Sequence, residues 1–162
     1  KKMKKTSNIA YRISKHISYK EATHSNYAQQ FSIENKPKDE HVKNMELIAD
    51  KVFEPLREWV GGPIKVNSMF RSLELNTALK GSYKSSHMTG NAIDITSMGG
   101  KTNLEMFHYI KDNLDFDQLI WEFGSEPQWL HVSYKNKKDN RKQVLVTKKR
   151  GYYRVWEDCE NC

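Results

Sequence analysis

Two histidines and one aspartate have the residue types and the spacing of metal ligands. His87 precedes Asp94 by seven residues, with Gly90 between them, and His131 lies further along the chain. Gly90 allows the backbone to turn sharply between the first two. Two imidazoles and one carboxylate leave a fourth coordination position open for water, which is the composition of a catalytic rather than a structural zinc site.

The local sequence predicts strands at two of these residues. Residues 91–96 alternate Ile93 and Ile95 with polar residues such as Asp94, which is the period of a half-buried strand. Residues 129–134 alternate in the same way, so His131 projects from the face opposite the aliphatic residues. If the two strands are neighbours, we expect the three side chains to converge.

Spacing alone leaves other interpretations open. A single histidine is more often a hydrogen-bonded polar residue than a ligand, and an aspartate near a strand end often caps a turn. Iron oxygenases also use two histidines and one carboxylate. The other four histidines have no partner at ligand spacing, and we expect them to be structural or exposed: His16, His24, His41 and His108.

A family resemblance rests on these same residues. The stretch from 85 to 94 resembles the Ser-x-His-x-x-Gly-x-Ala-x-Asp signature of the D-Ala-D-Ala carboxypeptidase-like zinc peptidases, matched at Ser85, His87, Gly90, Ala92 and Asp94. Trp129-Leu130-His131 is similar to the strand that carries the last ligand of that family. Phe70-Arg71-Ser72 and residues 116–124 are similar to stretches of phage-encoded members, and the likeness runs from about residue 17 to residue 144. The resemblance implies that His87, Asp94 and His131 bind Zn²⁺.

The resemblance also implies roles for further residues. In the family, zinc polarises the scissile carbonyl and a water, a carboxylate takes the proton of that water, and an arginine stabilises the oxyanion. Arg71 is the candidate for the oxyanion or for a substrate carboxylate, since a guanidinium can bind either bidentately. Its alternative role is that of a surface arginine or an ion-pair partner.

The general base is the point at which this chain departs from the family pattern. Many relatives have Asp or Glu three residues before the last histidine, whereas this chain has Gln128, which cannot accept a proton at neutral pH. We expect Glu122, which has a counterpart in the related hedgehog fold, to act as the base, with Glu126 as the second candidate. Gln128 and Ser85 are candidates for substrate binding, and Ser85 is also expected to orient a ligand.

The leading hypothesis is therefore a zinc peptidase that cuts peptidoglycan stem peptides, as a D,D-carboxypeptidase or as an endolysin-type endopeptidase. Gln128 motivates an alternative, a non-catalytic zinc-containing module that binds the cell wall. The formal charge of +7 suits a polyanionic partner. No helix-turn-helix, zinc-finger or aromatic RNA-binding pattern accompanies the lysines, so we expect no nucleic-acid partner.

The ends of the chain and its hydropathy set further expectations. Residues 1–5 are basic, but polar residues follow them instead of an apolar stretch, so no signal peptide is visible. No apolar run approaches the roughly 18 residues of a membrane helix. We expect a monomer that acts on the bacterial cell wall, phage-encoded and released or delivered by a virion. We divide the chain into a basic tail (1–16), a peptidase domain (17–156) and a C-terminal tail (157–162) in which Cys159 and Cys162 are inert.

The elements that must position these residues are those of a single α+β domain. Periodicity predicts a helix over residues 42–59, with Pro37 in its first turn, Pro55 bending or splitting it, and Gly61 ending it. Ser72 and Asn103 are expected to cap two further helices. Further strands are predicted at 64–70, 118–123, 143–147 and 152–156, and residues 1–35 are expected to be a tail with an irregular or briefly helical segment. This order favours a mainly antiparallel sheet with helices on one side, and the resemblance implies a hedgehog-like or D-Ala-D-Ala-peptidase-like fold.

Overall fold

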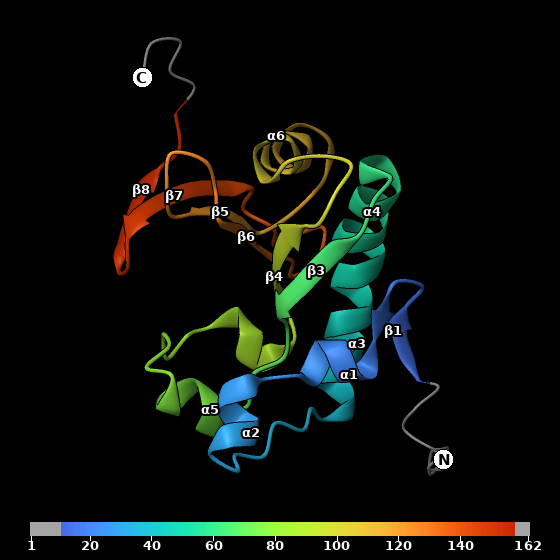
Figure 1. The fold of residues 1–162 in the computed structure, drawn as a ribbon, viewed down its shortest axis with the longest axis vertical. Coiled ribbons are helices and arrows are strands. Elements are labelled where there is room, and N and C mark those ends of the chain that lie inside the picture. The colour runs from blue at the N-terminus through green and yellow to red at the C-terminus, as the bar shows by residue number, and fades with distance from the viewer. Residues whose placement is uncertain (1–10, 158–162) are drawn as a thin grey trace.

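A six-stranded sheet forms the centre of the fold in the computed structural model, which describes residues 11–157 (Figure 1). The spatial order is β3-β4-β6-β5-β7-β8. Every neighbouring pair is antiparallel except β5 and β7, which run parallel. The strands are β3 (Ile64–Ser68), β4 (Ala92–Ser97), β5 (Gln118–Glu122), β6 (Trp129–Ser133), β7 (Gln143–Lys149) and β8 (Tyr152–Val155). The predicted α+β class with a mainly antiparallel sheet is confirmed.

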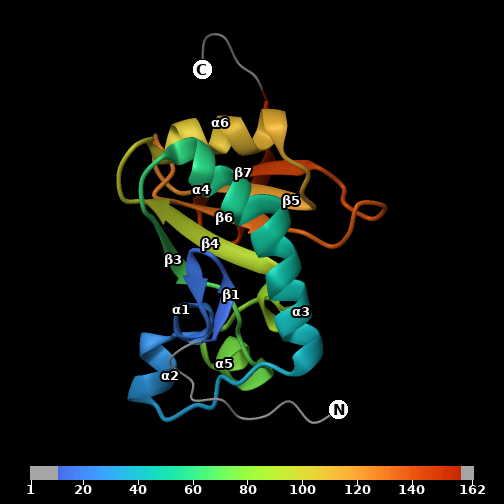
Figure 2. The ribbon, with the colours of Figure 1, turned by 90° about the vertical axis from the view of Figure 1, so that its right-hand side faces the viewer.

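The long helices gather on one side of this sheet, as predicted. They are α3 (Asp39–Ile48), a π-helical segment η1 (Ala49–Phe53), α4 (Glu54–Val60) and α6 (Asn103–Asn113), and Figures 1 and 2 show them along one side of the sheet. The aliphatic side chains of the central strands face these helices and form the core, among them Ile93, Ile95, Leu119, Leu130 and Val132. The opposite face carries Asp94, Glu122 and His131, together with Ile120 and Leu145. No helix in residues 11–157 is long and apolar enough to cross a membrane.

Pro55 divides the predicted long helix, as expected. Its ring has no N–H to donate and crowds the preceding turn, so a regular α-helix cannot continue through it. The chain widens into η1, where the N–H of Glu54 donates to the carbonyl of Ala49 five residues earlier, and α4 then starts with proline in its first turn. Gly61, with φ of 67°, ends α4. The prediction for Pro37 was wrong, because the N-cap is Lys38 and Pro37 precedes it.

The N-terminal part of the described chain contains a hairpin that the sequence did not indicate. Strands β1 (Arg12–Ser14) and β2 (Ile17–Ser18) are too short for an alternating pattern to be visible. Two short helices, α1 (Tyr19–Thr23) and α2 (Asn26–Gln30), agree with the expected briefly helical segment. The hairpin spans residue 16, where the tail was predicted to end, and Ile13 is buried in the core. The basic residues at positions 1–5 and the two cysteines, Cys159 and Cys162, lie outside the described residues.

The starts of two helices, α5 and α6, and the end of strand β3 differ in part from the sequence prediction. Ser72 caps α5 (Leu73–Ala78) as predicted. The prediction for Asn103 was wrong: Thr102 is the N-cap of α6, and its side chain accepts a hydrogen bond from the N–H of Glu105. Asn103 instead donates to the carbonyls of Pro127 and Gln128, each at 3.0 Å, and so ties α6 to the segment before β6. Strand β3 ends at Ser68 rather than at residue 70, since Phe70 donates its N–H to Ala22 outside the sheet.

Candidate metal centre

The three predicted metal ligands come from two neighbouring strands and one tight turn. Asp94 on β4 is the direct cross-strand partner of His131 on β6. His87 lies in a 3₁₀ turn, η2 (Ser86–Thr89), which leads into β4. Gly90 follows this turn with φ of 79°, and a Cβ at this position would collide with the carbonyl oxygen of His41. The turn therefore requires glycine, as the sequence predicted.

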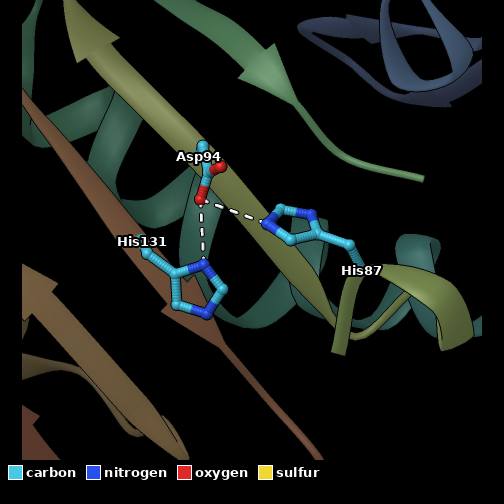
Figure 3. A group of neighbouring side chains, drawn as sticks. All are labelled: His87, Asp94 and His131. Atoms are coloured by element: carbon cyan, nitrogen blue, oxygen red, sulfur yellow. Dashed lines mark hydrogen bonds and ion pairs between the residues drawn. The ribbon is translucent and has the colours of Figure 1, made fainter. Parts of the chain in front are cut away.

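The ligand atoms of the three side chains converge, as Figure 3 shows. Oδ1 of Asp94 lies 2.9 Å from Nδ1 of His131 and 3.2 Å from Nε2 of His87. All three ligand atoms lie within 4.8 Å of one another, and His87 is only 3% exposed. This group could hold a metal ion, and its two nitrogens and one oxygen match the donor set that zinc accepts in catalytic sites.

His87 gives a direct test of whether a cation fits. Its Nδ1 lies 2.7 Å from the carbonyl oxygen of Met69, which can only accept, so Nδ1 carries the hydrogen. In the neutral ring, Nε2 then directs a lone pair toward Asp94, which is unfavourable unless a proton or a metal ion lies between them. A carbonyl behind a histidine is also the usual partner that orients a metal ligand. The residues fit a bound zinc ion.

Asp94 supplies the negative charge of the centre. Burial alone would raise the pKa of its carboxyl group, but the neighbouring His87 and His131 hold that pKa well below its usual range. The carboxylate is therefore ionised at neutral pH, as a metal ligand must be.

A cleft of about 500 Å³ opens beside the three ligands. Its floor is the sheet face that carries Asp94 and His131, one wall is the segment between α5 and His87, and the other wall is the turn between β7 and β8. The side chains that line it include Arg71, Lys80, Lys84, Ser85, Glu122, Arg150 and Tyr153.

Glu122 lies at the end of β5, on the sheet face that carries His131. Their shared face follows from the register, in which Ile120 is paired with His131 and Glu122 with Trp129. Burial raises the pKa of Glu122 to about 7, and the charge of Asp94 acts in the same direction while that of His131 opposes it. A carboxylate that is partly protonated at neutral pH is well matched to proton transfer.

Arg71 brings a positive charge to the cleft. Its Nη1 donates to Oδ1 of Asn76 at 3.1 Å, and its Nε is buried with no hydrogen-bond partner. Burial lowers the pKa of the guanidinium, Asp94 raises it and Arg150 lowers it. Arginine stays protonated despite such a shift, so Arg71 contributes a positive charge to the lining of the cleft.

The other predicted site residues are divided between the cleft and the surface. Ser85 lines the cleft, and its Oγ accepts the N–H of His87 at 3.3 Å, so it helps to fix the turn that carries this ligand. Glu126 and Gln128 are exposed and line no part of the cleft. They lie in the turn between β5 and β6, before the strand that carries His131 begins. The expectation that they serve the site has no support in this geometry.

Sequence reasoning missed several residues of the cleft, notably Lys80, Arg150 and Tyr153. Gly151 between two predicted strands is the signal that could have placed Arg150 at a hairpin turn. The pKa of Tyr153 is raised, first by burial and then by the charge of Glu122, which places the two side chains in one environment.

The comparisons with known proteins agree with this arrangement. A family model described as Peptidase M15 matches residues 15–133, a range that includes all three candidate metal ligands together with Arg71 and Glu122. A search of curated proteins finds no match.

Proposed function

The chain belongs to the peptidase M15 family, and from this premise we propose that it is a zinc-dependent peptidase that hydrolyses peptide bonds in the stem peptides of bacterial peptidoglycan. The observation that carries the proposal is the convergence of His87, Asp94 and His131 beside a cleft that also contains Glu122. The M15 family consists of zinc peptidases, which supports both the metal and the reaction type.

Nε2 of His87, the carboxylate of Asp94 and Nδ1 of His131 would hold the zinc ion. When bound, zinc would supply a Lewis acid that polarises the scissile carbonyl and makes water a better nucleophile. The hydrogen bond from His87 to Met69 and the strand pairing of Asp94 with His131 keep the donor atoms in place before the metal arrives. Little reorganisation is therefore needed for binding.

Glu122 is the proton carrier in this proposal. Its carboxylate takes a proton from the attacking water and passes it to the leaving amine, which is the usual cycle of a general base that becomes a general acid. A pKa of about 7 suits both halves of that cycle near neutral pH. Arg71 donates to the oxygen that becomes negative in the transition state, because its guanidinium stays charged and its side chain lines the cleft beside the metal ligands.

The proposal covers both a D,D-carboxypeptidase and an endolysin-type endopeptidase, and it places the action of the protein at the bacterial cell wall. The test is to incubate zinc-loaded protein with defined muropeptides and to identify the fragments by mass. We expect new amine-bearing fragments that are absent with chelator and with His87→Ala. Turnover that survives complete zinc removal would contradict the mechanism. Retention on cell-wall sacculi without any product would favour the alternative of a non-catalytic binding module.

A further inference from the structure

The β7–β8 hairpin forms one wall of the cleft. It lies beyond residues 15–133, the range that the Peptidase M15 family model matches. Leu145, Arg150, Gly151 and Tyr153 from this hairpin all line the cleft. Gly151, with φ of 84°, forms the turn, and a side chain there would meet nothing within 4 Å. Arg150, the residue before this glycine, is exposed and lines the cleft.

Arg150 spans the cleft toward its opposite wall. Its Nη2 donates to the carbonyl of Leu79 at 3.0 Å, a contact between residues 71 positions apart. A guanidinium has five N–H donors, so this bond leaves most of them free. Within residues 11–157, Arg150 forms no ion pair with a carboxylate.

The charge lining the cleft is unbalanced in a way that favours an anion. Arg71, Lys80, Lys84 and Arg150 line it, and none of them forms an ion pair within the described part of the chain. Two acidic groups also line it: Asp94, which is already engaged by both histidines, and Glu122, which forms no ion pair within the described residues. Two guanidinium groups in one cleft without a carboxylate partner form a binding site for negative oxygen atoms.

These two arginines suit different oxygens of one substrate. Arg71 comes from the segment next to η2 and donates its backbone N–H to the carbonyl of His87, so it lies beside the metal ligands. Arg150 comes from the far wall of the cleft and contacts Leu79. Arg71 can therefore serve the reacting carbonyl, whereas Arg150 can serve a charged group on a neighbouring part of the peptide.

We propose that Arg150 is a specificity-determining residue that binds a free carboxylate of the peptide substrate. The inference rests on the proposed peptidase function and adds that the preferred substrate carries this carboxylate close to the scissile bond. Two sources supply the same chemistry, the α-carboxylate at the C-terminus of the stem peptide and a side-chain carboxylate within it.

The experiment compares three matched stem peptides: one with both carboxylates free, one with the C-terminus amidated and one with the side-chain carboxylate amidated. Turnover and, separately, calorimetric binding are measured for the wild type, Arg150→Gln and Arg150→Lys. The control is Arg154→Gln, which removes the same charge from an exposed position of β8 that does not line the cleft.

One of the amidated peptides should lose about tenfold to a hundredfold in kcat/KM and in binding with the wild type, as expected for hydrogen bonds to a charged group. Which peptide loses identifies the source of the carboxylate. Arg150→Gln should lower kcat/KM by a similar factor on the peptide with both carboxylates free, and should not lower it on the amidated peptide that the wild type disfavours. Arg150→Lys should restore part of the difference between these two peptides. Arg154→Gln should behave as wild type.

Two results separate this inference from the proposed function. Turnover that is equal for all three peptides, or that Arg150→Gln lowers equally for all of them, overturns the role of Arg150 and leaves the peptidase intact. Binding that distinguishes the peptides through Arg150 without any turnover overturns the peptidase and retains the carboxylate site.

Discussion

Asp94 and His131 lie directly opposite each other on neighbouring antiparallel strands, with Oδ1 of the aspartate 2.9 Å from Nδ1 of the histidine. The sheet therefore fixes two of the three ligands by backbone pairing alone. The third, His87, depends on the turn η2, whose geometry in turn depends on Gly90.

Zinc should stabilise the folded protein, since the converging donors exist as a group only in the folded chain. Zinc at a thousandfold its Kd should add about 4 kcal/mol to the free energy of unfolding. Thermal unfolding with chelator and with added zinc measures this difference. Asp94→Asn should abolish the response and the stoichiometric zinc, whereas Asp50→Asn at an exposed position should leave both unchanged. A zinc response that persists in Asp94→Asn would place the metal elsewhere.

Glu122→Gln should lower kcat by about a hundredfold or more while zinc content stays at the wild-type level, because it removes the proton acceptor and no ligand. Glu126→Gln is the matched control, and its exposed position outside the cleft predicts wild-type turnover. The two variants therefore decide between the carboxylates that the sequence left open. Equal losses in both would contradict the assignment.

Ionisation of Glu122 should determine the acid limb of the pH profile of kcat/KM. The active form of Glu122 is ionised, so kcat/KM should rise with pH through the pKa of this group, which burial places at about 7. A bound cation favours the ionised form, so the limb of the zinc-loaded enzyme should lie at or below that value. The limb should disappear in the residual activity of Glu122→Gln, and a limb that stays unchanged there belongs to another group.

Gly90→Ala should lower the free energy of unfolding by more than the cost of placing alanine at a positive φ. A non-glycine residue at positive φ costs about 1–2 kcal/mol, and the added Cβ would also collide with the carbonyl of His41. Gly151→Ala is the matched control, because its φ is also positive but its surroundings are open. Urea unfolding should show a larger loss for Gly90→Ala, and zinc affinity should fall in that variant alone. Equal losses would show that the contact with His41 is unimportant.

Local patterns in the sequence were sufficient for most of the fold and for the three candidate ligands. Alternation around Asp94 and His131 predicted both strands and the shared polar face, since burial on one side of a sheet fixes the register of each strand. Pro55 predicted the break in the long helix, because the missing N–H is a local property. Asn103 was misassigned as a cap because a neighbouring Thr102 with Glu105 forms the capping box instead.

The features that could not be predicted from the sequence depend on contacts between distant segments. The bond from Arg150 to Leu79 joins residues 71 positions apart, and no local pattern contains that information. The choice between Glu122 and Glu126 depends on where β5 ends, and the positive φ of Phe123, 60°, turns the chain away immediately after Glu122. The parallel pairing of β5 with β7 likewise follows from the sheet as a whole.

Asp117→Asn should destabilise the fold at neutral pH, because this buried carboxylate anchors the segment between β6 and β7 that leads to the hairpin. It accepts three hydrogen bonds from Arg141: from the backbone N–H at 3.1 Å, and from Nε and Nη2 at 2.9 Å each. Burial raises the pKa of Asp117, but the bonds and charge of Arg141 outweigh it and hold the pKa below the usual 3.8. Because the folded-state pKa is depressed, the stabilisation is complete above pH 3.8 and is lost as the pH falls toward the folded-state value.

Urea unfolding of Asp117→Asn should therefore show a loss of about 1.5–3 kcal/mol at pH 7, and the difference from wild type should narrow below pH 4. Asp139→Asn, an exposed aspartate of the same segment, should change little at either pH. A gap between wild type and Asp117→Asn that stayed constant down to pH 3 would show that the aspartate acts through its shape and not through its charge.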